Sequence, residues 1–155
     1  MTNARQLLVE YELGVVKDAQ LIEWACEILS EDNALAKDQD LISLAGLLPS
    51  VRAELEMAGE YFRRLIQRHF REFCLQSPEG VQLAREILKR RCEEYVDGRI
   101  APYDLCALVS PIEQHFDFPV WLGDLYNACD WVERSTKRED VPYLVEEAQK
   151  IHRAA

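Results

Sequence analysis

The sequence has little glycine and proline and no long uninterrupted apolar run. Six glycines and six prolines occur in 155 residues, too few for a low-complexity or loop-dominated chain. No apolar stretch approaches the ~18 residues of a membrane-spanning helix, so we expect no membrane contact. The first residues, MTNARQLLVEYELG, lack the basic start and apolar run of a secretory signal. These absences predict a cytoplasmic protein.

Sequence motifs of catalysis are also absent. Neither GxxxxGK(S/T) nor GxGxxG occurs, which excludes the common phosphate-binding loops, and the nucleophile motif GxSxG is missing too. We therefore expect a protein that is not an enzyme. One alternative stays open, a small enzyme or ligand binder with a pocket between helices that uses His69 or a cysteine.

Metal-binding patterns are missing as well. None of the three histidines has an acid three residues before it, so the paired Glu-x-x-His motif of di-iron bundles does not occur. The acidic segment DNALAKDQD lacks the central glycine of a calcium-binding loop. We predict no metal and no other cofactor.

The cysteines are few and widely spaced. None of them forms a CxxC pair, and their number is odd: Cys26, Cys74, Cys92, Cys106 and Cys129. Each lies in an apolar helical pattern, which is typical of buried free cysteines in a reducing compartment. The sequence therefore predicts free, buried thiols.

Apolar residues recur with helical spacing over most of the chain. Between Asp18 and Ser30 they fall at i, i+1, i+3, i+4, i+7 and i+8, which is an amphipathic stripe. We predict an all-α fold, a compact multi-helix bundle of about six to seven antiparallel-packed helices that forms a single helical domain over residues 1–155. Helical patterns cover about 3–12, 18–30, 38–48, 51–75, 78–97, 101–116, 118–132 and 139–153, and not every one of them need be a separate helix.

The chain is strongly acidic, with a formal charge of -10. Residues 1–60 carry 4 basic and 12 acidic side chains, residues 61–100 carry 9 and 6, and residues 101–155 carry 5 and 10. A field of this sign repels the phosphates of nucleic acids and anionic lipids, and it attracts basic proteins. We expect a basic protein partner and no direct binding to nucleic acid.

The basic middle of the chain places Arg64, Arg68 and Arg71 on one side of a predicted helix. Glu60–Arg64 and Arg68–Glu72 have the i,i+4 spacing of helical ion pairs. Two interpretations stay open. The stripe is a salt-bridged helix surface, or it contacts acids on another chain, as in a homodimeric regulatory or scaffold protein.

Acidic residues gather around the polar segment that follows the second predicted helix. They are Glu31, Asp32, Asp38 and Asp40. A solvated loop explains them without any function, whereas a docking site for a basic partner gives them one.

The segment FPVWLGDLYNACDWV raises the question of what Trp131 does. On a helical wheel Trp121 lies within the apolar stripe, and Trp131 lies about 120° from it. Two interpretations stay open for Trp131. Either a second neighbouring helix covers it, or its side chain anchors a basic partner, as tryptophan does at many binding hot spots. The polar residues expected around such an anchor are Asp117, Asp124, Asn127 and Asp130.

The segment from Leu13 to Pro49 contains Leu-Gly, then LIEWA, an acidic gap and LIxL. In this order it resembles small all-helical bacterial proteins of the toxin-immunity type, although Lys17-Asp18 stands where a Ser-Pro-type helix start is expected. The resemblance implies a stoichiometric inhibitor whose partner is a toxin domain. The expected function is thus a non-enzymatic protein-binding module, with an immunity protein as its specific form.

Overall fold

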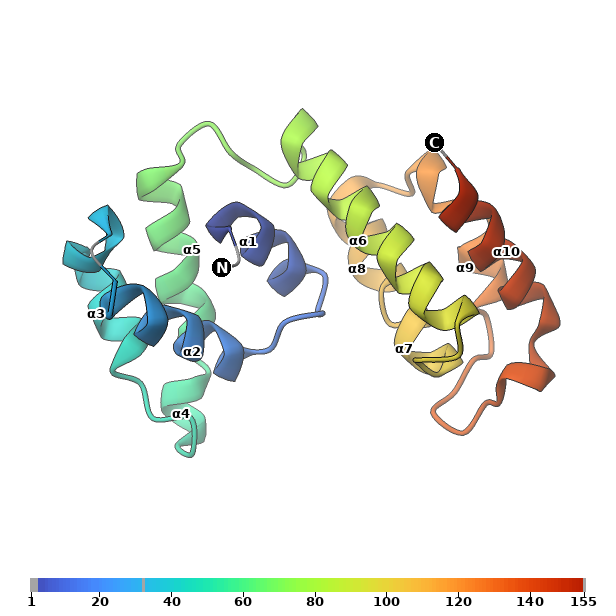
Figure 1. The fold of residues 1–155 in the computed structure, drawn as a ribbon, viewed down its shortest axis with the longest axis horizontal. Coiled ribbons are helices and arrows are strands. Elements are labelled where there is room, and N and C mark those ends of the chain that lie inside the picture. Colours follow the sequence, from blue (N-terminus) through green and yellow to red (C-terminus); the bar gives the residue numbers. More distant parts are fainter. Residues whose placement is uncertain (1–2, 32, 155) are drawn as a thin grey trace. The chain divides into compact units, whose positions relative to one another are not determined.

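The computed structural model describes residues 3–31 and 33–154, and within these ranges the fold is all-α, as predicted, with no strand (Figure 1). The contacts of the chain group into two compact units, Met1–Phe73 and Cys74–Ala155. Each unit is described by itself, and the single domain expected over residues 1–155 stays a prediction. Among the described residues, no helix combines the length and the apolarity needed to cross a bilayer.

The first unit is built from helices that pack around α5. Its elements are α1 (Ala4–Glu12), α2 (Asp18–Leu29), the 3-10 turn η1 (Ala34–Lys37), α3 (Gln39–Ala45), α4 (Arg52–Leu55) and α5 (Ala58–His69). Helices α1, α2 and α3 all contact α5, and α2 also packs along α3. Phe62 of α5 is fully buried at the centre of this unit, with the rings of Trp24 and Tyr11 edge-on to it.

The longest predicted helix, 51–75, is wrong in both its continuity and its end. The chain forms α4 and then α5, which ends at His69 because Phe70 leaves the helical region with φ -133° and ψ 60°. Residues 70–77 form a connection instead. Arg71 therefore lies beyond α5, and the three arginines do not share one helix.

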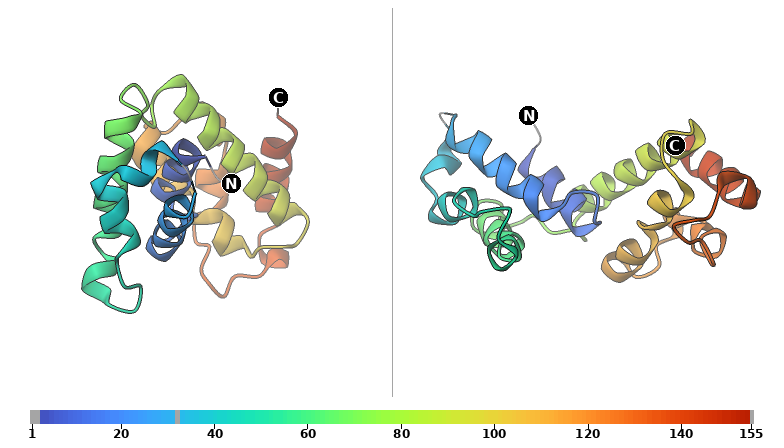
Figure 2. Two further views of the ribbon diagram at one scale, coloured as in Figure 1. Left: turned by 60° about the vertical axis from the view of Figure 1, so that its left-hand side comes forward. Right: turned by 90° about the horizontal axis from the view of Figure 1, so that it is seen from below.

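The second unit contains the helices from α6 to the C-terminal end. Its elements are α6 (Pro78–Val96), α7 (Pro102–Cys106), α8 (Val109–Phe116), η2 (Val120–Leu122), α9 (Leu125–Ala128), η3 (Arg138–Asp140) and α10 (Pro142–Arg153). Helix α10 packs along α6 and against α9 (Figure 2). Tyr95, Leu105 and Leu144 are fully buried between these helices.

Helix α6 begins where the sequence predicts. Ser77 is its N-cap and its hydroxyl accepts a hydrogen bond from the Gly80 amide at 3.2 Å. Pro78 is tolerated at the first helical position because the amide that it lacks would have no helical partner there. Gly98, with φ +76°, follows the other end. Local cap chemistry is therefore sufficient to place this helix.

The cysteine prediction is wrong for four of the five residues. Cys106 and Cys129 form a disulfide with Cα atoms 5.4 Å apart. Cys26 and Cys74 are free but exposed, and Cys92 alone is free and buried. Because stable disulfides are typical of oxidising compartments, the bond removes the thiol argument for a reducing cytosol.

Candidate functional site

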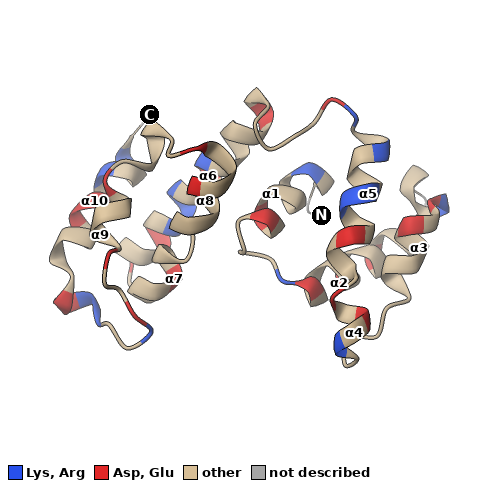
Figure 3. Cartoon of the chain, turned by 180° about the vertical axis from the view of Figure 1, so that it is seen from behind, with Lys and Arg blue, Asp and Glu red and all other residues tan. Residues whose placement is uncertain are grey.

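The first candidate site joins α3 to α5 through charged side chains, which we call the acid–arginine cluster: Asp38, Asp40, Arg64, Arg68 and His69. Arg68 donates to Asp38 Oδ2 at 2.7 Å through Nη1 and to Asp40 Oδ2 at 2.6 Å through Nη2. Arg64 Nη2 lies 3.1 Å from Asp40 Oδ1, and His69 Nε2 lies 2.7 Å from Asp38 Oδ2. Figure 3 shows the basic residues along α5.

Asp38 is the most enclosed carboxylate of this cluster. Its side chain is 4% exposed, and its Oδ1 also accepts from the Asp40 amide at 2.8 Å, which caps α3. Burial by itself raises the pKa of Asp38, but the hydrogen bonds from Arg68 and His69 outweigh it and hold the pKa at about 2. The carboxylate is therefore ionised and already satisfied within its own unit.

The four acids predicted as one docking surface do not come together as such. Asp38 and Asp40 are occupied by arginines of α5. Glu31 is half-buried after the end of α2, and Asp32 lies outside the described residues. This surface offers a basic partner little open negative charge.

The arginine stripe is largely consumed by the same cluster. Arg64 makes the predicted pair with Glu60 at 3.2 Å and adds Asp40. Arg68 pairs with Asp38 and Asp40 in place of Glu72. These pairs match the salt-bridged interpretation of the stripe and leave Arg71 apart from the other two. A homodimer through this stripe stays a prediction without a specific contact in its favour.

The second candidate site is the loop around Trp131. The predicted helix over 118–132 does not form as one piece, because Gly123 turns the chain with φ +62° between η2 and α9. Trp131 lies after α9, 90% exposed, with φ +70°. The interpretation that a second helix covers this side chain is therefore wrong. A left-handed backbone is a strained conformation for a bulky residue, and such strain is concentrated at functional positions.

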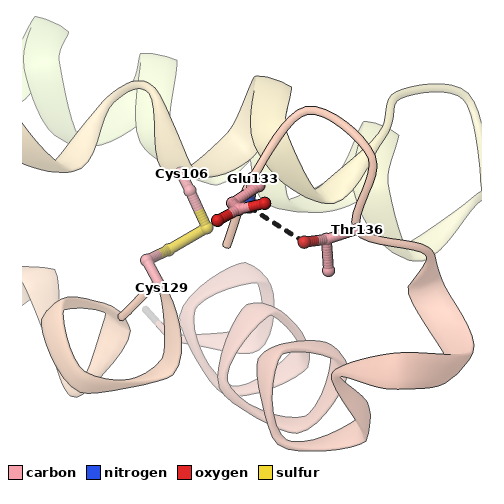
Figure 4. Close-up of a disulfide and its surroundings, with 4 residues drawn as sticks. All are labelled: Cys106, Cys129, Glu133 and Thr136. Carbon is pink, nitrogen blue, oxygen red and sulfur yellow. Dashed lines mark hydrogen bonds between the residues drawn. A yellow bond between two sulfur atoms is a disulfide. The ribbon is translucent and has the colours of Figure 1, made fainter. Parts of the chain in front are cut away.

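Covalent and polar contacts hold the loop that carries Trp131, residues 129–138, which we call the Trp131 loop. Cys129 opens it and is bonded to Cys106, the last residue of α7 (Figure 4). Within the loop the Glu133 amide donates to Thr136 Oγ1 at 2.8 Å. The loop is thus fixed close to the tryptophan that it displays.

Two arginines fasten the far part of the Trp131 loop to the unit. The guanidinium carbon of Arg134 lies 4.7 Å from the centre of the Tyr103 ring. Arg138 donates to the carbonyl oxygens of Tyr95 and Val96 at 2.6 and 2.9 Å. These carbonyls lie in the last turn of α6, where helical partners run out and a cation is favourable.

The polar residues predicted around Trp131 divide into a bonded and an open group. Asp124 accepts from Asn127 Nδ2 at 2.5 Å and from the Tyr143 hydroxyl. The Tyr143 bond, with help from Asn127, lowers the pKa of Asp124, and the same bond raises the pKa of Tyr143 to about 12. Asp117 and Asp130 are exposed and have no side-chain partner among the described residues.

Other large apolar side chains are exposed in the same stretch of the second unit. Phe118 and Val120 are 64% and 96% exposed, and Phe118 makes an edge contact with the exposed Tyr126. Most exposed hydrophobic side chains on a protein occur singly. Phe118, Val120 and Tyr126 therefore leave apolar side chains open to solvent within one short segment.

Metal ligands, cysteine and histidine are the side chains that bear on the alternative of an enzyme or ligand binder. Among the described residues, no group of three or more His, Cys, Asp or Glu gathers in a way that could hold a metal ion. Burial raises the pKa of the Cys92 thiol to about 12, which removes it as a thiolate nucleophile. His69 is exposed, and its Nε2 lies 2.7 Å from Asp38 Oδ2, so it lines no pocket between helices of the first unit.

No protein-family model, no curated protein and no solved structure matches this chain.

Proposed function

We propose that the protein is a non-enzymatic protein-binding module that docks through the Trp131 loop. The observation that carries this proposal is Trp131 itself, 90% exposed in a left-handed turn. An exposed tryptophan promotes self-association of the protein unless a binding partner covers it. Tryptophan is also the residue type most enriched at the energetic centres of interfaces.

The way the loop is held supports the same proposal. A bond to Cys106 and the contacts of Arg134 and Arg138 restrain the loop before any partner arrives. Binding then orders fewer side chains and less backbone, which improves affinity without new contacts. An exposed tryptophan on a restrained loop is a suitable anchor.

The partner is a basic protein. Asp117 and Asp130 carry exposed carboxylates without side-chain partners among the described residues, and residues 101–155 hold 10 acidic against 5 basic side chains. Opposite charge on the partner raises the association rate and disfavours acidic competitors. In its specific form, supported by the resemblance of residues 13–49, the module is a bacterial immunity protein that neutralises a basic toxin domain.

Affinity capture from cell lysate with three forms of the chain tests the docking role. Wild type is compared with Trp131→Ala and with Leu48→Ala, a control that removes another exposed apolar side chain. A basic partner retained by wild type and the control, but bound roughly 30-fold more weakly by Trp131→Ala, supports the proposal. Equal retention by all three forms overturns it.

The immunity form has its own test. The captured partner, once purified, is assayed for its toxic activity while the chain is added. We expect inhibition to be complete at one chain per partner molecule. We also expect it to weaken as the salt concentration is raised, because salt screens the opposite charges that bring the two proteins together. If the chain suppresses no activity of the captured partner, the immunity role is overturned and the docking role stands.

A further inference from the structure

A groove of about 270 Å³ opens in the second unit among α6, η2 and α10. Its walls are largely apolar, since Leu88, Trp121 and Ile151 line it. Four of its lining residues carry charge: Arg85 and Lys89 of α6, and Glu147 and Lys150 of α10. Figure 3 colours the basic and acidic residues of these helices. The groove does not include the Trp131 loop.

Two of these cations have no partner within the part of the chain that the structure describes. Arg85 and Lys89 are four residues apart on α6, so their side chains lie on the same face of that helix. Both are half-buried, and neither makes an ion pair, a hydrogen bond or a ring contact among the described residues. A partly desolvated cation without a counter-charge is unfavourable, so an anion that reaches both is stabilised there.

The one acid of the groove is already neutralised. Glu147 is 4% exposed. Its Oε1 accepts from Lys150 Nζ at 3.0 Å, and its Oε2 accepts from the Asp124 amide at 3.3 Å. Lys150 and Glu147 therefore neutralise each other. The remaining charge in the groove is positive and comes from Arg85 and Lys89 of α6.

We propose that this groove binds a small organic acid that has one aromatic or branched aliphatic group. The carboxylate lies between Arg85 and Lys89, because a guanidinium matches its two oxygens and an ammonium adds a point charge. The apolar group packs on Trp121, Leu88 and Ile151. The volume lies just under the roughly 300–1,000 Å³ of sites for drug-sized ligands, which limits the occupant to a molecule with one ring or one short branched chain.

Titration of the full chain with three acids tests this site. The probes are benzoate, 3-phenylpropionate and 4-methylpentanoate, followed by backbone amide shifts and by the indole N–H signal of Trp121. 3-Phenylpropionamide is the matched control, since it keeps the ring and removes the charge. We expect at least one acid to saturate the signals of the groove below about 5 mM, and the amide to bind roughly tenfold more weakly or not at all.

Variants of the cations separate this site from a general charge effect. Arg85→Gln and Lys89→Gln are each expected to weaken acid binding roughly tenfold, whereas Arg99→Gln, which removes an exposed cation of the same unit outside the groove and outside the Trp131 loop, leaves it unchanged. Circular dichroism and thermal melting establish that each variant folds.

Three results overturn the proposal. None of the acids binds up to about 5 mM, or the amide binds as well as its acid, or Arg99→Gln weakens binding as much as the groove variants do. A fourth result reassigns the occupant: an acidic peptide that carries the same aromatic group binds far more tightly than the free acid, and the groove then serves a protein and not a small molecule.

Discussion

Cys106 and Cys129 are covalently joined, and through this bond α7 holds the chain two positions before the exposed Trp131. The two cysteines are 23 residues apart in sequence. Closing a loop of this length restricts the unfolded chain and stabilises the native state by about 3 kcal/mol in the chain-entropy model. The bond therefore links the stability of the second unit to the fixed position of its loop.

The double variant Cys106→Ser/Cys129→Ser is expected to lower the free energy of unfolding of the second unit by about 3 kcal/mol. Urea denaturation measures this, and Cys26→Ser, which removes an exposed free thiol, is the neutral control. Thiol titration of the unfolded, unreduced wild-type chain is expected to count Cys26, Cys74 and Cys92 only. Five titratable thiols in that experiment would rule out the disulfide.

Trp131→Gly is expected to be more stable than Trp131→Ala by about 1 kcal/mol, the reverse of the usual order. The reason is the left-handed backbone at this residue, with φ +70°, which costs a residue with a Cβ roughly 1–2 kcal/mol and glycine almost nothing. Paired urea denaturation curves measure the difference. An alanine variant as stable as the glycine variant would mean that the turn relaxes to a right-handed conformation.

Acid is expected to weaken the first unit through Asp38. The pKa of this carboxyl falls from 3.8 to about 2 on folding, so its contribution of about 2 kcal/mol is complete above pH 4 and is lost as the pH falls towards 2. Asp38→Asn removes that contribution and flattens the dependence of stability on pH. Urea denaturation at several values from about pH 5 to about pH 2 follows both forms.

Glu23→Gln is the control for this experiment. Glu23 is exposed on α2 and takes no part in the acid–arginine cluster. Its variant is expected to follow wild type through the whole pH range. A wild-type curve that matches that of Asp38→Asn would contradict the ionised, bonded state of Asp38.

Gly80→Ala is expected to destabilise the second unit by about 2 kcal/mol or more. A Cβ at Gly80 would overlap the backbone carbonyl oxygens of Cys74 and Leu75, which cannot move without the connection that carries them. Gly46→Ala is the matched control, because its Cβ would lie 3.5 Å from its nearest neighbour, the Ile42 oxygen. Thermal melting of both variants gives the comparison.

Local chemistry allowed the sequence to place several helices. Asn3 and Ser77 act as N-caps and Gly98 follows α6, and each of these signals lies within a few residues of the helix end that it marks. The break between α4 and α5 carries no glycine or proline, so apolar spacing alone carried the predicted helix across it and on to residue 75. Short-range signals therefore predict helix ends only where they are present.

The candidate sites depend on contacts that spacing does not determine. The partner of Cys106 is 23 residues away, and cysteine positions alone do not give connectivity. Asp38 meets Arg68 across two helices, so a wheel drawn for one helix cannot find the pair. For Trp131 a signal was present in Gly123, a glycine in the middle of a predicted helix, which marks the turn that ends the regular wheel.

Because the contacts of the chain group into two units, thermal unfolding disrupts two separate cores. A molecule that binds only the folded form of one unit raises the melting temperature of that unit by mass action. The melting temperature of the other unit stays unchanged. A partner bound through Trp131, or an acid bound by Arg85, would then raise the melting temperature of the second unit, Cys74–Ala155, alone. A calorimetric trace with and without the added molecule would report, without any label, which half it occupies.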